Sequence, residues 1–242
     1  AAVVDSDGRE INRNRLIALS AYIAASGRKG AVIVTDSVTS DGLREFIEDN
    51  LGGKHIRFKR GYKNVIDEAI RRTELGENVP LAIETSGHAA FKENYYLDDG
   101  AYLVTKIIIK AAVLQKENKK IGDCIAELKK PLEEKELRFN ITEEDFRIIG
   151  EKLIEDIKCL AEESDEMILA PDNYEGVRVS FKDENRNGWF LLRLSVHDPV
   201  MPFNSESDSE GGCIEICKTF YEIVKNVKGV DFTPLQDFIK MS

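Results

Sequence analysis

The chain has 242 residues, of which 42% are hydrophobic and 32% are charged, and its formal net charge is -10. This composition is typical of a globular protein with enough residues for two modest domains. The acidic balance makes binding to a nucleic-acid backbone or to an anionic membrane improbable, whereas a small anionic ligand needs only a few local cations and backbone N–H groups. The longest apolar run, near Ala101 to Leu114, contains Lys106 and Lys110 and is too short and too charged to span a bilayer.

The four cysteines form no C-x-x-C pair. Cys213 and Cys217 lie one helical turn apart, but a zinc site would need two further ligands, and the three histidines are distant in sequence. No signal peptide is visible in the charged start of the sequence. We therefore expect reduced thiols, no metal ligands and a cytoplasmic location.

The first 27 residues predict one strand and one helix without a partner sheet. The expected elements are a strand at Ala1–Val4, a turn at Asp5–Gly8 and a helix from Arg15 to about Ala25. Asn12 or Asn14 can cap this helix, and Gly27 ends it. Asp5 and Asp7 also suggest a metal loop, but turn chemistry is favoured. We expect residues 1–27 to be the C-terminal remnant of a preceding α/β domain.

Residues 28–131 repeat a strand–helix unit. The expected strands are Ala31–Val34, His55–Phe58 and Val79–Ile83, and the expected helices run from Leu43 to about Asn50, through Val65 and Ile70 to near Gly76, and onward from Asp99. This alternation predicts a parallel sheet covered by helices on both faces, a three-layer αβα domain. Because crossovers are right-handed, the loops Thr35–Ser40, Lys59–Lys63 and Glu84–His88 should meet at one sheet edge.

These loops carry groups that suit a polyhydroxyl ligand with a phosphate. The third loop offers the Glu84 carboxylate, the Ser86 hydroxyl and the His88 imidazole, and Gly87 lets a ligand approach closely. The first loop offers hydroxyls. The second offers Arg60, Gly61 and Lys63. Asp98 and Asp99 are expected to cap the following helix.

Lys129-Lys130-Pro131 is the expected domain boundary. The pattern beyond it predicts a strand at Leu137–Ile141, a helix from about Phe146 to Leu160, a hairpin of Val177–Phe181 and Trp189–Ser195, and, after a loop rich in Pro, Asp and Ser, a helix at about Gly211–Val227. Residues 132–242 should therefore form a smaller α+β domain with an antiparallel sheet.

One loop of this second domain is a candidate phosphate site. Arg193 and Ser195 lie two residues apart at a strand end and should point to one face. His197, Asn204 and Ser205 follow. A guanidinium beside several hydroxyls can hold a phosphate dianion bidentately. The alternative is that Arg193 pairs with a neighbouring carboxylate and the serines are ordinary loop residues.

Four stretches resemble the α-D-phosphohexomutases, the phosphoglucomutase/phosphomannomutase group. Glu84-Thr85-Ser86-Gly87-His88 resembles their sugar-binding Glu-x-Ser-Gly-His loop, and Asp98-Asp99-Gly100 follows it as in that family. Lys59-Arg60-Gly61-Tyr62-Lys63 is similar to their neighbouring substrate loop. Ala2–Arg9 is similar to the segment just after their metal loop. The resemblance covers essentially the whole chain.

The resemblance implies transfer of phosphoryl from a phosphoserine to a hexose 1- or 6-phosphate, reorientation of the bisphosphate, and return. Glu84 and Ser86 would hold sugar hydroxyls, His88 would contact sugar or phosphate, and Arg193 and Ser195 would hold the phosphate that is not transferred. In the family the active serine and the Mg²⁺-binding Asp-x-Asp-x-Asp-Arg loop precede the part that resembles this chain. The resemblance therefore implies a fragment without a catalytic residue or metal ligand, inactive by itself.

The phosphate loop departs from the family pattern. The family usually shows Arg-Pro-Ser-Gly-Thr-Glu-Pro, and this chain has Arg-Leu-Ser-Val-His-Asp-Pro over Arg193–Pro199. His197, Asn204 or Ser205 would supply the missing contacts. The expected partner is a hexose phosphate, and the sequence fixes no oligomeric state. The alternative function is a non-catalytic α/β module that binds a sugar phosphate, a nucleotide or a sugar acid.

Overall fold

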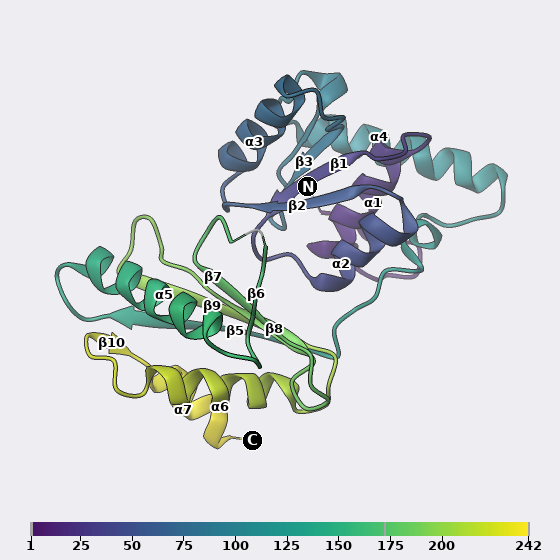
Figure 1. The fold of residues 1–242 in the computed structure, drawn as a ribbon. Helices are drawn as coiled ribbons and strands as arrows, with labels where there is room; N and C mark the ends of the chain where they lie inside the picture. Colours follow the sequence, from purple (N-terminus) through teal and green to yellow (C-terminus); the bar gives the residue numbers. More distant parts are fainter. Residues whose placement is uncertain (1, 172, 242) are drawn as a thin grey trace. The chain divides into compact units, whose positions relative to one another are not determined.

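The computed structural model describes residues 2–171 and 173–241. The chain divides into two compact units, residues 1–130 and 131–242, each with its own sheet (Figure 1). The two units together form the α/β and α+β arrangement expected from the sequence, so the predicted fold class is confirmed.

The first unit contains a four-stranded sheet in the order β2-β1-β3-β4. Its strands are β1 Val32–Asp36, β2 Lys54–Phe58, β3 Leu81–Ile83 and β4 Ala89–Phe91. Its helices are α1 Asn14–Ala25, α2 Asp41–Glu45, the π-helix η1 Phe46–Asn50, α3 Tyr62–Glu74, the 3₁₀ turn η2 Lys92–Asn94, α4 Gly100–Lys116 and the 3₁₀ turn η3 Ile121–Ile125. As expected, β1, β2 and β3 are parallel. The antiparallel edge strand β4 was not predicted.

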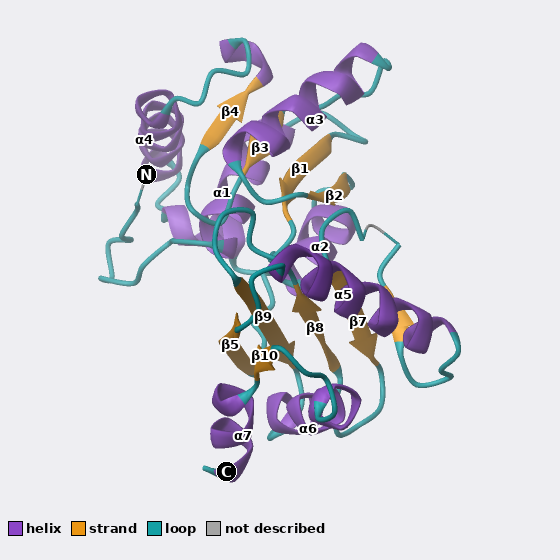
Figure 2. Ribbon diagram, turned by 90° about the vertical axis from the view of Figure 1, so that its left-hand side faces the viewer, coloured by secondary structure: helices purple, strands orange, loops and turns teal. Residues whose placement is uncertain are grey.

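Alternate residues of the strands enter two cores on opposite faces of this sheet. Ile33 and Leu81 pack with α1, α2 and α4, whereas Val34 and Ala82 pack with α3. Both sides of the strands are apolar because both are covered, which explains their continuous hydrophobic runs. The result is the expected three-layer order, with helices on either side of the sheet (Figure 2).

The N-terminal segment lies inside the first unit, since Leu16 and Leu19 of α1 are part of the core that also contains β1 and β3. The expected first strand was wrong among the described residues, because Val4 makes only an isolated antiparallel bridge to Glu10. Asp5–Gly8 is a turn, as favoured over a metal loop. The expected caps were also wrong. Arg13 precedes α1 without a side-chain cap, and the Asn12 and Asn14 side chains accept hydrogen bonds from Val3 and Ser40 instead.

The second unit contains a fully antiparallel sheet in the order β10-β5-β9-β8-β7-β6. Its strands are β5 Glu133–Ile141, β6 Ile168–Leu169, β7 Val177–Phe181, β8 Gly188–Leu192, β9 Val200–Ser207 and β10 Val230–Asp231. Its helices are α5 Phe146–Glu162, α6 Gly212–Val224 and α7 Thr233–Lys240. All three helices contribute to one core with Phe139, Phe190 and Phe203, which share one face of the sheet.

Strand β9 corrects the expected loop before α6. Its apolar residues Met201 and Phe203 alternate with polar or proline residues, so the pattern is a strand with one face in the core. Pro202 lies within this strand. It is accommodated because its carbonyl accepts the Arg193 N–H at 3.0 Å, although it has no N–H to return. In the described part of the chain, no helix combines the length and apolarity needed to cross a membrane.

Candidate functional site

The carboxyl ends of the three parallel strands meet through side-chain contacts, as expected. Thr85, after β3, donates from its hydroxyl to Oδ2 of Asp36 at the end of β1 at 2.6 Å. Glu84 accepts a hydrogen bond from the Gly61 backbone N–H, after β2, at 2.6 Å. The three loops therefore form one connected edge in the first unit.

Glu84 is buried and ties two loops together. Its Oε1 accepts from Gly61, and its Oε2 accepts from the Ser86 hydroxyl at a longer 3.3 Å. Ser86 itself is exposed. The turn is closed by backbone bonds from Gly87 to Glu84 and from Glu84 to His88, and Gly87 has a φ of 90°, which favours glycine. The turn thus presents Ser86 and His88 while Glu84 braces it from within.

His88 is held on two sides. Its Nδ1 lies 2.6 Å from Oδ2 of Asp98, and its ring stacks on Tyr62 with centroids 5.3 Å apart. Because a carboxylate only accepts, Nδ1 carries the proton in this bond, and Nε2 is the nitrogen left to exchange a proton or a hydrogen bond with a ligand. The prediction that Asp98 caps α4 was therefore wrong, whereas Asp99 does cap it by accepting from the Tyr102 N–H.

Asp36 is fully buried beneath the turn. Its Oδ1 also accepts from the Thr85 N–H at 3.3 Å, and the Arg60 Nε lies 4.0 Å from its Oδ2. Burial raises the pKa of Asp36 to about 6, with Glu84 adding to the rise and the Thr85 hydroxyl and Arg60 opposing it. The edge therefore contains two buried carboxylates, Asp36 and Glu84.

The first loop does not offer its hydroxyls to a ligand, which corrects the expectation. Thr39 and Ser40 are buried. Ser40 caps α2 by accepting from the Leu43 N–H, and Thr39 accepts from Arg57, whose guanidinium also binds Asp41 at 2.6 Å. These side chains therefore stabilise the loop through hydrogen bonds within the protein.

The second loop presents cations at the surface. The Arg60 side chain is 46% exposed, which leaves its far end accessible while its Nε faces Asp36. Lys63 is exposed and pairs with Asp67 one helical turn later. Gly61 has a φ of 115°, and its N–H is the donor to Glu84. The loop therefore brings the predicted Arg60 and Gly61 to the turn and places Lys63 farther out on α3.

In the second unit, Arg193 and Ser195 continue the β8–β9 ladder. The Arg193 N–H donates to Pro202 and the Ser195 N–H donates to Val200, so the two side chains lie on the same face, as predicted. Arg193 is buried, and its guanidinium lies 3.5 Å from the Glu175 carboxylate. The alternative of a carboxylate partner for Arg193 is thus realised in this conformation.

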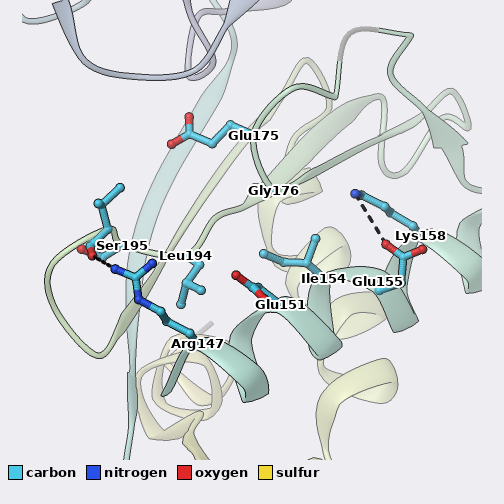
Figure 3. Close-up of a pocket in the computed structure, with 10 residues that line it drawn as sticks. Arg147, Glu151, Ile154, Glu155, Lys158, Glu175, Gly176, Leu194 and Ser195 are labelled. Carbon is cyan, nitrogen blue, oxygen red and sulfur yellow. Dashed lines mark hydrogen bonds and ion pairs between the residues drawn. The ribbon is translucent and has the colours of Figure 1, made fainter. Parts of the chain in front are cut away.

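Beside this loop lies a pocket of about 380 Å³. Figure 3 shows the Arg147 side chain on the side of Ser195, Glu175 opposite the helix and the Glu155–Lys158 pair at the other end. The Arg147 guanidinium donates to the Val196 carbonyl at 2.8 Å and so steadies the loop. The charged side chains that line the pocket are two cations and three carboxylates, so the pocket is not a simple anion site.

The remaining phosphate-site candidates separate. His197 is exposed in the loop. Asn204 pairs with Leu191 in the β8–β9 ladder and therefore lies on the same face of the sheet as Arg193. This is the face opposite the core that contains α5, α6 and α7, and it is called the helix-free face below. Ser205 points the other way, is 1% exposed, and donates to the Cys213 sulfur at 3.6 Å. The prediction for Ser205 was therefore wrong, because neighbouring residues of a strand face opposite sides of a sheet.

Within residues 2–171 and 173–241, no three His, Cys, Asp or Glu side chains gather as metal ligands. Burial raises the pKa of Cys213 to about 11 and that of Cys217 to about 12, so both thiols stay protonated at neutral pH.

Sequence reasoning missed four residues of these sites. Asp36 directly follows an apolar run, which is a usable signal for the end of a buried strand. Asp98 resembled a helix cap. Tyr62 was quoted within its loop but not singled out. Glu175 has no local signal, since it reaches Arg193 only through the β7–β8 pairing.

Comparison with known proteins identifies the family. Residues 12–132 match the family model described as phosphoglucomutase/phosphomannomutase, alpha/beta/alpha domain III. The chain is 29% identical over 210 residues to a phosphomannomutase/phosphoglucomutase of Pseudomonas putida, covering 86% of this chain and 41% of the relative. It is 30% identical over 210 residues to a phosphoglucomutase/phosphomannomutase of Thermococcus kodakarensis, covering 87% of this chain and again 41% of the relative.

Solved structures agree. A phosphoglucomutase/phosphomannomutase family protein of Burkholderia thailandensis superposes with a TM-score of 0.71 at 25% identity, over 94% of this chain and 44% of that one. An Aspergillus fumigatus N-acetylphosphoglucosamine mutase in complex with glucose 1,6-bisphosphate shares the fold, with a TM-score of 0.57 at 14% identity over 93% of this chain and 46% of that one. This chain belongs to the phosphoglucomutase/phosphomannomutase family. It spans about two fifths of the length of the curated relatives it matches.

Proposed function

We propose that this chain is the sugar- and phosphate-recognition part of an α-D-phosphohexomutase, an intramolecular phosphotransferase that interconverts hexose 1-phosphate and hexose 6-phosphate. In this proposal a phosphoserine gives its phosphoryl group to the sugar, and the resulting bisphosphate turns round and returns the other group. The phosphoserine and the Mg²⁺ ligands would come from sequence outside this chain. By itself the chain is expected to bind a hexose phosphate without turnover, in the cytoplasm.

The observation that carries this proposal is the braced turn Glu84–His88. Ser86 and His88 are exposed on a turn that Glu84 ties to Gly61, so a hydroxyl and an imidazole are presented in fixed positions. Sugar hydroxyls need donors and acceptors at fixed spacing, because every polar group left unpaired on binding costs affinity. Glu84 can add an acceptor if Ser86 turns its hydroxyl from Oε2 to the sugar.

His88 supplies a site for proton exchange. Asp98 fixes Nδ1 as the protonated nitrogen, which supports a role for Nε2 in giving a proton to, or taking one from, a sugar hydroxyl or phosphate oxygen. Arg60 lies on the adjacent loop, and its side chain is 46% exposed. Its guanidinium can therefore contact a phosphate of the ligand. The complex of the Aspergillus mutase with glucose 1,6-bisphosphate supports the ligand class.

Arg193 would hold the phosphate that is not transferred. Its guanidinium lies 3.5 Å from Glu175, which is longer than a direct ion-pair hydrogen bond, so a phosphate dianion would compete with the Glu175 carboxylate for it. Ser195 lies on the same face and adds a hydroxyl. A phosphate bound here must therefore outcompete Glu175, and this predicts tighter binding to a Glu175→Gln variant.

The test is a calorimetric titration of this chain with glucose 1-phosphate, glucose and a nucleoside monophosphate. Glu84→Gln should weaken both sugars. Arg193→Ala should weaken glucose 1-phosphate by about 1.5–3 kcal/mol and spare glucose. Arg138→Ala, on the helix-free face of the same sheet with its side chain 71% exposed, is the matched control and should change neither. Binding of the nucleotide in preference to both sugars would favour the binding-module alternative.

A further inference from the structure

The Asp36 carboxylate is a buried acid that sugar recognition does not use directly. Asp36 is the last residue of β1 and is fully inaccessible to solvent. Both of its carboxylate oxygens accept hydrogen bonds from Thr85. A buried carboxylate is costly unless its contacts compensate for lost hydration. A valine or threonine would fill a buried strand end at lower cost, so the acid calls for an explanation in terms of what it holds.

We propose that Asp36 is a positioning residue: by accepting two hydrogen bonds from Thr85, it fixes the turn that presents Glu84, Ser86 and His88. Its consequence for ligand affinity rests on the function proposed above. Its effect on the turn rests on the geometry of the first unit alone.

The geometry gives Asp36 control of the middle of the turn. Glu84 is tied to Gly61 at one end, and His88 is tied to Asp98 at the other. Between them, Thr85 is half-buried, and its N–H and its hydroxyl both donate to Asp36. Without these two hydrogen bonds, the turn around Thr85 is held only by the backbone bonds from Gly87 to Glu84 and from Glu84 to His88.

The charges around Asp36 make its hydrogen bonds to Thr85 sensitive to protonation of the Asp36 carboxyl. Arg60, from the loop after β2, faces it with Nε 4.0 Å from Oδ2, and Glu84, from the end of β3, is the neighbouring carboxylate. When Asp36 is ionised it accepts from both Thr85 donors and attracts Arg60. When it is protonated, one oxygen carries a hydrogen and is a weaker acceptor, so its bond to Thr85 is weakened and the attraction for Arg60 is lost.

The experiment follows the turn without a ligand. In a ¹⁵N- and ¹³C-labelled chain, the amide shifts and hydrogen exchange of residues 85–88 and the Asp36 carboxyl carbon are recorded from pH 5 to 7.5. Thr85→Val removes the hydroxyl bond and should raise the exchange rate of the turn amides about tenfold, the loss expected for one hydrogen bond. Asp36→Ala removes both bonds and should raise it at least as much. Asp49→Ala, an exposed acid at the end of η1 in the same unit, is the matched control and should leave them unchanged.

Asp36→Asn separates the hydrogen bonds from the charge. Its Oδ1 can accept from the Thr85 N–H while its Nδ2 donates to the Thr85 hydroxyl, so protection of the turn should return close to the wild-type level. The wild-type turn amides should titrate together with the Asp36 carboxyl carbon, and this titration should be absent from Asp36→Asn. A merely structural role would not produce that difference.

The outcomes are distinct. If Asp36→Asn and Thr85→Val fold, and the turn amides of Thr85→Val match the wild type at every pH, the positioning role is overturned. If the turn moves as expected and glucose 1-phosphate binds about tenfold more weakly to Asp36→Ala or Thr85→Val, the role extends to the ligand. If the turn moves but no protein binds glucose 1-phosphate, Asp36 still positions the turn and it is the proposed function that fails. If Asp36→Ala does not fold, Thr85→Val and Asp36→Asn decide alone.

Discussion

The backbone N–H of Gly61 donates a 2.6 Å hydrogen bond to Oε1 of Glu84. The two residues follow β2 and β3, and these strands are not neighbours, because β1 lies between them in the sheet. The bond therefore bridges the end of β1 and joins the cation-bearing loop to the Glu84–His88 turn. A carboxylate used in this way shapes the site before any ligand arrives.

Removing this bridge should loosen the first unit. Glu84→Ala leaves the Gly61 N–H without its acceptor and should lower the free energy of opening of β1 and β3 by about 1–3 kcal/mol. Glu84→Gln should cost less, because Oε1 can remain in place. Native-state hydrogen exchange of the β1 and β3 amides measures the change. Glu127→Ala, at an exposed position of the same unit, is the control, and equal exchange in Glu84→Ala and Glu127→Ala would contradict the bridging role.

The conformation of Gly61 should matter as much as its N–H. Its φ of 115° is strained for other residues, and an added Cβ would lie 3.0 Å from the Asn64 amide nitrogen. Gly61→Ala should therefore cost about 1–3 kcal/mol of stability and weaken hexose-phosphate binding, measured by chemical denaturation and by titration.

Gly100 supplies the matched comparison for that substitution. It begins α4, its φ is not in the left-handed region, and an added Cβ would meet open space. Gly100→Ala should be neutral or stabilising by up to about 1 kcal/mol. A similar loss of stability in both variants would show that the backbone of Gly61 has no special role.

Most of the fold was predictable because local patterns and tertiary structure agree. Continuous apolar runs followed by turn residues marked β1 and β3, since parallel strands are buried on both faces, and β2 followed from the strand–helix repeat. Strand β9 was missed because Pro202 and the polar residues after it suggest a loop, although every second residue enters the core. The edge strand β4 was too short to give a pattern, and its pairing with β3 is a tertiary fact.

The site was predictable as a location and less so in its contacts. Right-handed crossovers put the three loops together, and the turn residues Glu84, Ser86 and His88 were recognisable by type. The sequence did not show which polar side chains would bind other residues of the protein instead of a ligand, because those contacts depend on neighbours distant in sequence. Thr39 is used by Arg57, 18 residues away, and Asp36 is used by Thr85, 49 residues away.

The raised pKa of Asp36 predicts a pH dependence of stability. The folded value of about 6 exceeds the ordinary 3.8, so between these values the folded chain binds more protons than the unfolded chain. Stability from this group is therefore fully present below pH 3.8 and is lost as the pH rises through 6. The difference between the two pKa values corresponds to at most about 3 kcal/mol.

The comparison with Asp36→Asn isolates this contribution. The free energy of unfolding of the wild type relative to Asp36→Asn should fall as the pH rises from 4 to 7, measured by urea denaturation at each pH. Other titrating groups cancel in the difference. A difference that is constant across this range would mean that the Asp36 carboxyl keeps its ordinary pKa in the folded chain.

The two candidate serines of the second unit should behave in opposite ways. Ser195 lies on the same face as Arg193, so Ser195→Ala should weaken glucose 1-phosphate binding by about tenfold or more, the loss of one hydrogen bond to a charged group. Ser205 lies on the core face with its hydroxyl on the Cys213 sulfur, so Ser205→Ala should leave the affinity unchanged. Each removes one hydroxyl, and calorimetric titration compares them directly. Equal losses would contradict the assignment of the two serines to opposite faces of the sheet, and a loss confined to Ser205→Ala would place the phosphate on the helix side.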